Sequence, residues 1–458
     1  MNKGFSVLVL AAGKGTRFKS DAIKVLHHLM GRTMLQLVVD TIRGLAPNEI
    51  FVVVGYQKDD IIKQPFARDL RFVTQGSQLG TAHAVLAAEP ELRKSQDKDI
   101  LVINGDLPLL KTETLKPFLK HHQATENSLT FMTTDLENPA GFGRVFLEGR
   151  SLKIIEERDA TPLQRRIKEV NVGIYLFRIK DLVQALPKVT NANKKGEFYL
   201  TDLIAILGNQ GKTVGTYKTF RNEEIVGVND RYELARATES LRLRKIMTLM
   251  KSGVTVYDPS STWIDLDVKI GRDTTVYPSV IIEGNSVIGS HCTLYPHVHI
   301  LNSRLGKGVT ILSSTMIEHS RIEEKAQVGP FTHLRPKTII KKGAKVGNFV
   351  EMKNTVFGRN SKAGHLSYLG DAEVADEVNI GAGTITCNYD GVMKRKTRIE
   401  SGAFIGSGTE LVAPVTVGKN AYVGAGSTIT KDVSPESLAV SRSRQFEKKG
   451  WARRKRKK

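Results

Sequence analysis

A glycine-containing loop near the amino terminus carries cations that could bind phosphate. Residues 10–17 read Leu-Ala-Ala-Gly-Lys-Gly-Thr-Arg, and Lys24 follows closely. Small residues let backbone N–H groups approach anionic oxygens, and Lys14, Arg17 and Lys24 could neutralise charge that develops on a triphosphate during transfer. The spacing is neither that of a P-loop nor, with Phe18 in place of a third glycine, that of a dinucleotide fingerprint. A tight strand-to-helix turn with solvated lysines is the alternative interpretation.

A single acid, Asp106, follows the apolar run 100–103. Acids at the carboxyl end of a strand in an α/β sheet lie where ligands bind. Mg²⁺ needs only one or two protein oxygens beside substrate phosphates, so one aspartate with a distant helper is sufficient. Asp106 could instead cap the next helix, but Pro108 and Thr112 favour a later helix start. We therefore predict that Asp106 is a metal ligand.

These residues require a sheet to position them. Apolar and helical segments alternate from residue 6 to about 228. The expected strands are 6–12, 50–55, 71–75, 100–104, 129–133 and 172–177, and the expected helices are 35–45, 82–88 and 199–207. The alternation predicts an α/β domain with a Rossmann-like, mostly parallel mixed sheet that is covered on both faces.

The second half of the chain has a period of six. Three in-phase arrays of aliphatic residues are Ile270, Val276, Ile282, Ile288, Leu294, Ile300; Ile322, Val328, Leu334, Ile340, Val346, Met352; and Ile399, Ile405, Leu411, Val417, Val423, Ile429. A helix cannot keep a six-residue stripe on one face, and a long strand would alternate every second residue. Short strands with corners between them fit, which predicts a parallel β-helix of hexapeptide repeats whose coils bury their aliphatic residues by stacking. Sandwich strands with fortuitous spacing are the alternative.

Residues 230–250 lie between the two halves and are rich in Leu, Ala, Arg and Glu, with Gly253 beyond them. They predict one helix, which could span ~30 Å at the α-helical rise. The expected organisation is an α/β domain at 1–229, a helical arm at 230–253, a β-helix at 254–440 and a basic tail at 441–458. Arg242, Arg244 and Lys245 on the arm are interpreted as a solvated face.

The composition restricts the class of protein. The 68 Lys and Arg against 47 Asp and Glu suit nucleic acid or small polyanionic substrates. With Cys292 and Cys387 as its only cysteines, the chain has no disulfide framework, which favours a reducing compartment. We expect the apolar run 5–12 to be a first strand and not a signal peptide, because cations follow it. No run of ~18 apolar residues predicts a membrane span.

Several runs together carry a resemblance. In the first half they are residues 10–17, Lys24-Val25-Leu26-His27, Gln78-Leu79-Gly80-Thr81, Gly105-Asp106 and Gly141-Phe142-Gly143-Arg144. In the second half they are Leu334-Arg335-Pro336, Asn348-Phe349-Val350-Glu351-Met352-Lys353, 361–371 and 379–391. These runs resemble the sugar-nucleotide pyrophosphorylases and, with the hexapeptide array, the bacterial bifunctional N-acetylglucosamine-1-phosphate uridylyltransferase and glucosamine-1-phosphate N-acetyltransferase family, with a left-handed β-helix.

The resemblance covers nearly the whole chain and implies two reactions. Acetyl-CoA would acetylate glucosamine 1-phosphate, and UTP with Mg²⁺ would then convert the product to UDP-N-acetylglucosamine for envelope polymers such as peptidoglycan and lipopolysaccharide. Phosphoryl transfer of this kind needs alignment and charge neutralisation more than a covalent nucleophile. By resemblance the chain is expected to form a homotrimer. The cysteine usage and the lack of an expected membrane span favour a cytoplasmic protein, and no stable nucleic-acid partner is expected.

In the first half the resemblance also implies residue roles. The nucleotide contacts would be Leu10, Ala11, Gly13, Arg17, Lys24, Gln75, Gly80 and Thr81. Asp106 and Asn229 would hold Mg²⁺, and the N-acetylglucosamine 1-phosphate would bind at Gly141, Glu156, Asn171 and Asn229. The family commonly has tyrosine before its Gly-Asp pair, whereas Asn104 stands here, which leaves the contribution of this position to substrate contact open.

The period of six breaks between Met352 and Ile399, which indicates that function displaces packing there. By resemblance His365 is the general base that takes a proton from the 2-amino group, a task suited to a side chain that titrates near ~6.5. The implied sugar-phosphate ligands are Arg335, Lys353, Tyr368, Asn379 and Lys394, and the implied acetyl-CoA contacts are Ala382, Asn388, Tyr389, Ser407, Ala425 and Arg442.

Two other functions compete with this interpretation. A nucleotidyltransferase with one activity could use its β-helix only for structure or regulation, but His365, Lys353 and Lys394 together disfavour that. A basic scaffold could bind nucleic acid through the tail and the solenoid surface, although the sequence contains no stacking-aromatic module or reader helix.

Overall fold

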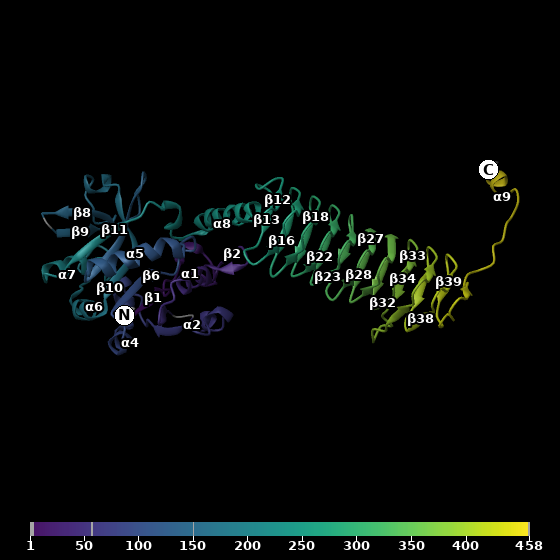
Figure 1. Ribbon diagram of the computed structural model, residues 1–458, viewed down its shortest axis with the longest axis horizontal. Coiled ribbons are helices and arrows are strands. Elements are labelled where there is room, and N and C mark those ends of the chain that lie inside the picture. The colour runs from purple at the N-terminus through teal and green to yellow at the C-terminus, as the bar shows by residue number, and fades with distance from the viewer. Residues whose placement is uncertain (1–3, 56–57, 150, 457–458) are drawn as a thin grey trace. The chain divides into compact units, whose positions relative to one another are not determined.

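The computed structural model describes residues 4–55, 58–149 and 151–456, and the chain separates into two compact units, 1–241 and 242–458. The first unit is built on one mixed sheet with helices on both faces, and the second is a solenoid of short stacked strands (Figure 1). No helix in the described ranges has both the length and the apolar character needed to cross a lipid bilayer.

The sheet of the first unit confirms the predicted α/β class. Its strands, in spatial order, are β11 (Val214–Lys218), β7 (Leu129–Asp135), β10 (Glu169–Arg178), β6 (Asp99–Asn104), β1 (Phe5–Leu10), β4 (Ile50–Val54) and β5 (Arg71–Thr74). β10 runs antiparallel to β6 and β7, and the other neighbours on this path are parallel. The central strands are continuous apolar runs because helices cover both of their faces.

The helices divide between the two faces. On one face pack α1 (Met34–Arg43), α2 (Lys58–Ile62) and α5 (Thr112–Thr125), and on the other α3 (Thr81–Ala87), α4 (Glu89–Lys94), α6 (Ile179–Ala185) and α7 (Asp202–Asn209). α5 begins six residues after Asp106, so this aspartate does not cap the helix and the predicted later start is confirmed.

The sequence pattern did not reveal every strand. β11, the hairpin of β8 (Arg144–Glu148) and β9 (Ser151–Ile155), and the small pair β2 (His28–Leu29) and β3 (Arg32–Thr33) were not predicted. β8 also pairs with β10 at Val170 and Arg144, which extends the sheet beside its carboxyl-end loops. The 3-10 turns are η1 (Thr16–Phe18), η2 (Lys24–Leu26), η3 (Pro65–Ala67), η4 (Gln164–Arg166), η5 (Leu186–Lys188) and η6 (Asn222–Glu224).

The second unit is a left-handed parallel β-helix with three faces, as predicted. The first face contains β12 (Thr255–Val256), β15 (Thr275–Val276), β18 (Thr293–Leu294), β21 (Thr310–Ile311), β24 (Gln327–Val328), β27 (Lys345–Asn348), β30 (Lys362–His365), β33 (Asn379–Ile380), β36 (Phe404–Ile405), β39 (Tyr422–Val423) and β41 (Leu438–Ala439). The second contains β13 (Trp263–Ile264), β16 (Ile281–Glu283), β19 (His299–Leu301), β22 (Met316–Glu318), β25 (His333–Leu334), β28 (Glu351–Lys353), β31 (Tyr368–Gly370), β34 (Ile385–Cys387), β37 (Glu410–Val412) and β40 (Thr428–Ile429). The third contains β14 (Lys269–Ile270), β17 (Val287–Ile288), β20 (Arg304–Leu305), β23 (Arg321–Ile322), β26 (Ile339–Ile340), β29 (Val356–Phe357), β32 (Ala372–Val374), β35 (Thr397–Ile399) and β38 (Val415–Val417).

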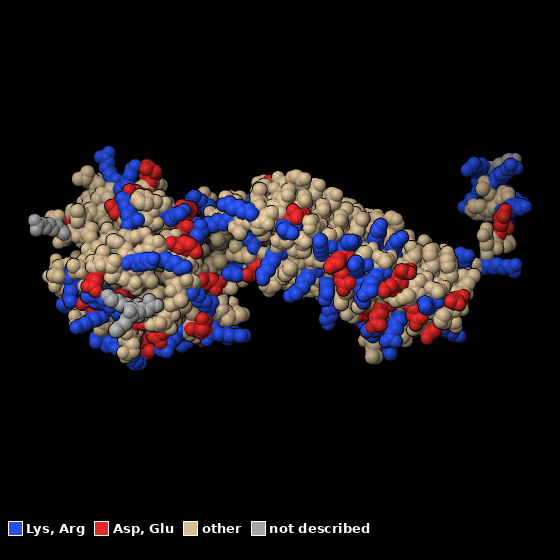
Figure 2. Space-filling view, viewed as in Figure 1, with Lys and Arg blue, Asp and Glu red and all other residues tan. Residues whose placement is uncertain are grey.

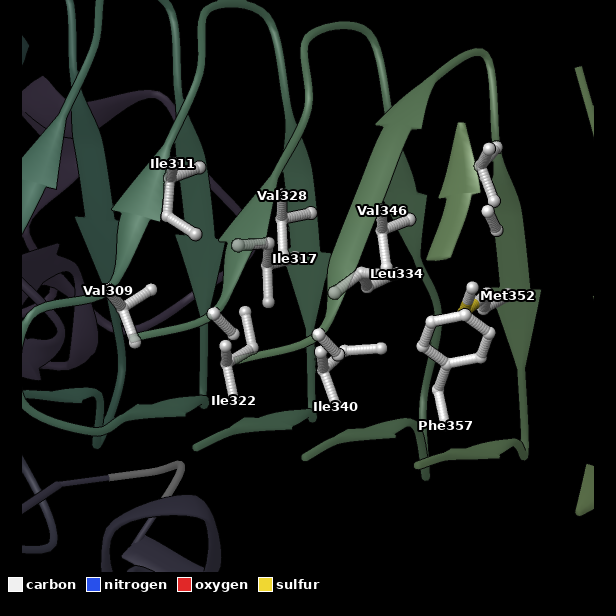
Figure 3. Packing of buried hydrophobic residues seen from close by; sticks show 14 of the residues in the cluster. Val309, Ile311, Ile317, Ile322, Val328, Leu334, Ile340, Val346, Met352 and Phe357 are labelled. Atoms are coloured by element: carbon white, nitrogen blue, oxygen red, sulfur yellow. The ribbon is translucent and has the colours of Figure 1, made fainter. Parts of the chain in front are cut away.

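The coils stack in strict register. Thr275 pairs with Thr293 and Thr293 with Thr310, so successive coils take 18 and 17 residues. Every residue of the three predicted aliphatic arrays is buried except Ile270, which is half-buried. Figure 3 shows Ile311, Val328 and Val346 among the side chains that fill the space between the three faces. Burying each such side chain is worth about 1.5–3 kcal/mol, which holds coils of two- to four-residue strands together.

One helix, α8 (Arg231–Lys251), occupies the stretch predicted to be helical. The interpretation of its basic residues as solvated was wrong for two of them. Arg242 is only 3% exposed and donates to the backbone carbonyls of Pro259 and Thr262, the latter at 2.8 Å. Lys245 Nζ donates to the carbonyls of Leu266 and Val268 at 2.8 and 2.7 Å. The prediction failed because the hydrophobic periodicity of a helix gives no sign of cations that bind backbone carbonyl groups.

Replacing Arg242 with methionine should destabilise the second unit. The apolar stem remains, but two carbonyls in the first coil lose a charged donor, which costs about 2–3 kcal/mol of unfolding free energy. Urea unfolding followed by the fluorescence of Trp263, next to Thr262, measures the change. Arg236→Met, at an exposed position on the same helix, is the control and should change the unfolding free energy by less than about 0.5 kcal/mol. Equal stability of the two variants would contradict a structural role for the guanidinium.

Charges of both signs are distributed over the surface. Figure 2 shows Lys and Arg interleaved with Asp and Glu on the visible face of each unit, without an unbroken basic stripe there. The basic end of the chain, 441–456, is exposed at every residue and contains the short helix α9 (Trp451–Lys455). Lys455 Nζ lies 4.8 Å from the centroid of the Trp451 ring.

Candidate functional site

The glycine loop brings two of the three predicted phosphate ligands, Arg17 and Lys24, together in the first unit, whereas Lys14 lines the second cavity described below. The loop leaves the carboxyl end of β1, and Gly15 has φ 62°. A Cβ at Gly15 would lie 2.5 Å from Lys24 Cβ, so only glycine lets η2 pass this close to the loop. Lys24 Nζ lies 2.6 Å from Asp106 Oδ2 and 3.1 Å from Asn229 Oδ1. Arg17 Nη2 donates to the same amide oxygen at 2.9 Å.

Asp106 and Asn229 present a donor set that suits Mg²⁺. Their carboxylate and amide oxygens converge on one cation, the Lys24 ammonium, and both are hard oxygen ligands. Backbone bonds fix the pair, because Val228 N donates to Asp106 O at 2.9 Å and Asn229 N donates to Glu233 Oε2 at 2.6 Å. Among the residues that the structure describes, no group of three or more His, Cys, Asp or Glu side chains could hold a metal ion. A cation here would complete its coordination with phosphate and water oxygens.

A cavity of about 410 Å³ gathers most of the predicted nucleotide contacts. The predicted residues that line it are Leu10, Ala11, Gly13, Lys24, Gln75, Gly80, Thr81 and Asp106. Gly80, with φ 118°, begins α3, and a Cβ there would lie 2.5 Å from the carbonyl oxygen of Phe198. The glycine therefore allows the 198–200 segment, which follows the cavity-lining Glu197, to pack against the start of α3, where Leu200 N also donates to Thr81 Oγ1 at 3.1 Å.

Three further polar residues line the same cavity without a predicted role: Gln78, Asn104 and Glu197. Gln78 Nε2 donates to the carbonyl of Ala12, and a second cavity of about 850 Å³ lies against the same loop and shares Ala11–Gly13 and Gln78. Glu197 lies far along the chain from the glycine loop, and no spacing rule links the two segments.

The predicted sugar-phosphate residues of the first unit form a neighbouring group. Asn171 Nδ2 donates to Tyr175 Oη at 2.6 Å, and Asn171 N donates to Gly143 O at 2.9 Å. Glu156 Oε1 accepts from Thr201 Oγ1 at 3.4 Å, and burial raises the pKa of the Glu156 carboxyl group. A Cβ at Gly143 would lie 3.5 Å from Glu156 Oε1, so these residues surround one position.

Gly141 stands at an exposed turn beside this group. It has φ 86°, a Cβ there would meet no atom within 4 Å, and its N–H donates to Glu157 Oε2 at 3.3 Å. Gly173 and Asn104 connect the group to the nucleotide cavity, since a Cβ at Gly173 would lie 2.9 Å from Asn104 Nδ2. The two groups are therefore neighbours across β6 and β10.

In the second unit, His365 ends β30 at the corner between the first and second faces and is exposed. Its Nδ1 hydrogen-bonds to Asn348 Oδ1, the residue at the equivalent position one coil earlier. Because an amide oxygen only accepts, Nδ1 carries the proton of the neutral ring, and Nε2 keeps a free lone pair. This is the tautomer that a general base requires.

A group of cations lies on and beside the second face. Arg335 and Lys353 follow each other from coil to coil, and Arg335 Nη1 donates to Glu351 Oε1 at 2.8 Å. Lys394 foremost, and then Arg335, lower the pKa of the Lys353 ammonium, since like charges disfavour one another. Tyr368 is on the same face, one coil beyond Glu351. Such a cluster suits a doubly charged phosphate group.

The predicted acetyl-CoA contacts occur in two sets. Ala382, Ser407 and Ala425 occupy the same corner as His365 on successive coils, and Arg442 Nη1 donates to Ala425 O at 2.8 Å. They form a line of small residues along the solenoid that starts at His365. Asn388 and Tyr389 lie instead in the loop after β34, at the opposite edge of the second face, where Asn388 Nδ2 donates to Asp371 Oδ2 at 2.5 Å.

Asn379 is not brought to the other sugar-phosphate residues. It lies on β33 of the first face, whereas Lys353 and Tyr368 lie on β28 and β31 of the second face. Asn379 and Tyr368 are each flanked by buried residues and Lys353 follows the buried Met352, so the three point outward from different sides of the solenoid. One chain therefore does not surround a ligand with all the residues that the resemblance implies.

Comparison with protein families agrees with the two units. Residues 7–170 match the model of a MobA-like NTP transferase domain, and residues 267–302 and 396–431 match that of the bacterial transferase hexapeptide, a motif of six repeats. The fold and the two groups of residues thus define a bifunctional transferase, with a nucleotidyltransferase domain followed by a hexapeptide acyltransferase domain.

Curated relatives match along the whole chain. The bifunctional protein GlmU of Geobacillus sp. (strain WCH70) is 46% identical over 456 residues, which cover 99% of this chain and 98% of the relative. That of Fervidobacterium nodosum is 47% identical over 450 residues, with 98% and 97% covered. The chain belongs to the family of bifunctional GlmU proteins.

A likeness among solved structures is weaker. A putative glucose-1-phosphate thymidylyltransferase from Bacillus anthracis has a TM-score of 0.41 and 18% identity, and covers 51% of this chain and 94% of its own. No argument rests on it.

Proposed function

We propose that the second unit transfers the acetyl group of acetyl-CoA to glucosamine 1-phosphate, and that the first unit then joins the product to the uridylyl group of UTP. The observation that carries this proposal is the presence of two separate cation-rich sites in one chain. One contains Lys24 and Asp106 beside a 410 Å³ cavity, and the other contains His365 at the start of a line of small residues.

In uridylyl transfer, an oxygen of the sugar 1-phosphate attacks the α-phosphorus of UTP, and pyrophosphate leaves. Arg17 and Lys24 bind phosphate oxygens and offset the charge that develops on them. Asp106 and Asn229 hold Mg²⁺, which supplies further charge neutralisation when bound. Glu156 and Asn171 bind the sugar, and Gln75, Gly80 and Thr81 bind the uridine. The chain needs no covalent nucleophile for this step.

In acetyl transfer, the 2-amino nitrogen of glucosamine 1-phosphate attacks the thioester carbonyl of acetyl-CoA. His365 Nε2 takes the proton from that nitrogen, the C–N bond forms, and the C–S bond breaks to release the thiol of CoA. Arg335, Lys353 and Lys394 bind the phosphate of the substrate. The line of Ala382, Ser407 and Ala425 accommodates the extended acetyl donor, with Arg442 at its far end.

The assembly is a cytoplasmic homotrimer whose acetyl-transfer site takes residues from two copies. This proposal is supported by the positions of Asn379 and Tyr368 on different faces, and of Tyr389 and Ala382 at opposite edges of the second face. Residues 1–229 carry nucleotidyl transfer and 254–440 acetyl transfer, with 230–253 as the connecting arm and 441–458 as a tail. The product, UDP-N-acetylglucosamine, supplies envelope polymers.

One incubation tests the function. Purified protein is mixed with glucosamine 1-phosphate, acetyl-CoA, UTP and Mg²⁺, and free thiol and pyrophosphate are measured separately. Thiol should appear without UTP, whereas pyrophosphate should appear only when acetyl-CoA or N-acetylglucosamine 1-phosphate is supplied. Pyrophosphate release with no thiol release in any mixture would instead support a nucleotidyltransferase whose β-helix is structural.

A further inference from the structure

The carboxamide of Gln75, which lines the nucleotide cavity, has a fixed orientation. Its Nε2 lies 2.9 Å from Nδ1 of His83, the third residue of α3, and 3.4 Å from the carbonyl oxygen of Gly80. The Gly80 oxygen can only accept a hydrogen bond, so the nitrogen end of the amide must face it. His83 Nδ1 therefore accepts the other amide hydrogen, and the neutral ring carries its proton on Nε2.

The Gln75 side chain is largely shielded from water. Gln75 is only 4% exposed, and its backbone N–H is bound to Val54 O at 2.8 Å at the end of β5. With Nε2 held by two acceptors, Oε1 is left as the hydrogen-bond acceptor of this side chain, with no partner among the described residues. Turning the amide over would place Oε1 against two lone pairs, which is unfavourable in a buried site.

The position of Gln75 in the cavity indicates which part of a bound nucleotide its side chain can contact. Lys24 and Asp106 line the cavity together with Gln75, and they belong to the cation cluster that suits phosphates. The Nε2 group of Gln75 is already bound, so this side chain offers the cavity only the acceptor Oε1, which can bind an N–H donor on the edge of a base but not an ionised phosphate oxygen. At ring position N3 uracil offers an N–H donor, whereas cytosine presents an acceptor there and carries its donor on the exocyclic N4, so an acceptor that faces N3 favours uracil.

We propose that His83 is a positioning residue that fixes Gln75 with its carbonyl oxygen toward the nucleobase, and thereby favours uracil over cytosine nucleotides. The proposal rests on the uridylyl transfer proposed above and adds to it the group that sets base selectivity. His83 does not touch the reacting atoms, and it acts through the orientation of the Gln75 amide.

The test compares the ratio of kcat/KM for UTP to kcat/KM for CTP, called the UTP/CTP ratio, in four variants: His83→Leu, His83→Asn, Gln75→Ala and the double variant of Gln75→Ala with His83→Leu. His83→Leu fills the ring volume without an acceptor, and the UTP/CTP ratio should fall about 5- to 10-fold, as expected for the loss of one hydrogen bond. His83→Asn places an amide oxygen near the Nδ1 position and should restore the ratio to within about twofold of the parent chain. In a Gln75→Ala background, His83→Leu should change the ratio no further, since the two side chains act as one unit.

Acetyl transfer by the same samples serves as the control for folding, because its proposed residues lie in the second unit. An unchanged UTP/CTP ratio in His83→Leu, or an equal fall in His83→Asn, would overturn the positioning role. So would a further fall of the ratio in the Gln75→Ala background. If the parent chain released no pyrophosphate from UTP, the proposed function would fail instead, and the two failures are thus distinguishable.

Discussion

Alanine in place of Asp106 should lower pyrophosphate release from UTP by about 10²–10³-fold or more, the usual effect of removing a group that stabilises developing charge. The carboxylate lies 2.6 Å from Lys24 Nζ and shares that cation with Asn229, so its loss removes the charged oxygen of the proposed Mg²⁺ site. It also leaves Lys24 without its ion-pair partner. Pyrophosphate release with saturating N-acetylglucosamine 1-phosphate and graded Mg²⁺ measures the effect.

The same sample contains its own control. Acetyl transfer by Asp106→Ala should stay within about twofold of the parent chain, because the residues proposed for it belong to a different compact unit. Asp60→Ala, at an exposed position on α2, should leave both reactions unchanged. A parallel loss of both activities in Asp106→Ala would count against two separate sites, and full uridylyl transfer would remove Asp106 from the metal site.

Alanine in place of His365 should lower thiol release from acetyl-CoA by about 10²–10⁴-fold, the usual contribution of a positioned general base. The imidazole is exposed, and Asn348 holds its Nδ1–H, so Nε2 is free to accept the amino proton. Thiol release from acetyl-CoA with glucosamine 1-phosphate as the acceptor measures the effect.

His297→Ala is the matched control for this substitution. His297 is exposed at the same corner of the solenoid on an earlier coil, and its loss should leave acetyl transfer unchanged. Asn348→Ala should lower the rate by about 10-fold, as expected for an outer residue that orients another. Acetyl transfer at the parental rate in His365→Ala would exclude this histidine as the base. Uridylyl transfer should be preserved in all three variants.

Much of the fold could be predicted because burial follows a simple sequence period in each half. Val328, Leu334 and Ile340 each face the core at a six-residue spacing, and no other regular structure places them there. The burial of Arg242 could not be predicted, because its partners are backbone carbonyls, and these are present in every residue whatever its type. The β8–β9 hairpin was missed because Leu152 and Ile154 are half-buried, and so the alternation is weak.

The candidate sites likewise contain some residues whose roles the sequence could indicate and others whose roles it could not. Lys14, Arg17 and Asp106 follow strands whose ends are recognisable, so their chemistry could be inferred from residue type and position. Asn229 lies 205 residues from Lys24, and only the resemblance connected it with the phosphate site. A role for His83 could not be predicted, because a histidine in an apolar helix indicates no function until its contact with Gln75 is known.

The loop after β34 has a consequence for how such a solenoid can acquire new chemistry. Asn379 pairs with Phe404, so this coil takes 25 residues, yet Ile380 still stacks on Ile405 and the core continues without a break. The additional residues, including Tyr389 and Lys394, form a loop that projects from one corner of the solenoid. A solenoid can thus gain an insertion during evolution without renewed selection on its interior, and a short peptide tag added at a comparable corner should be tolerated for the same reason.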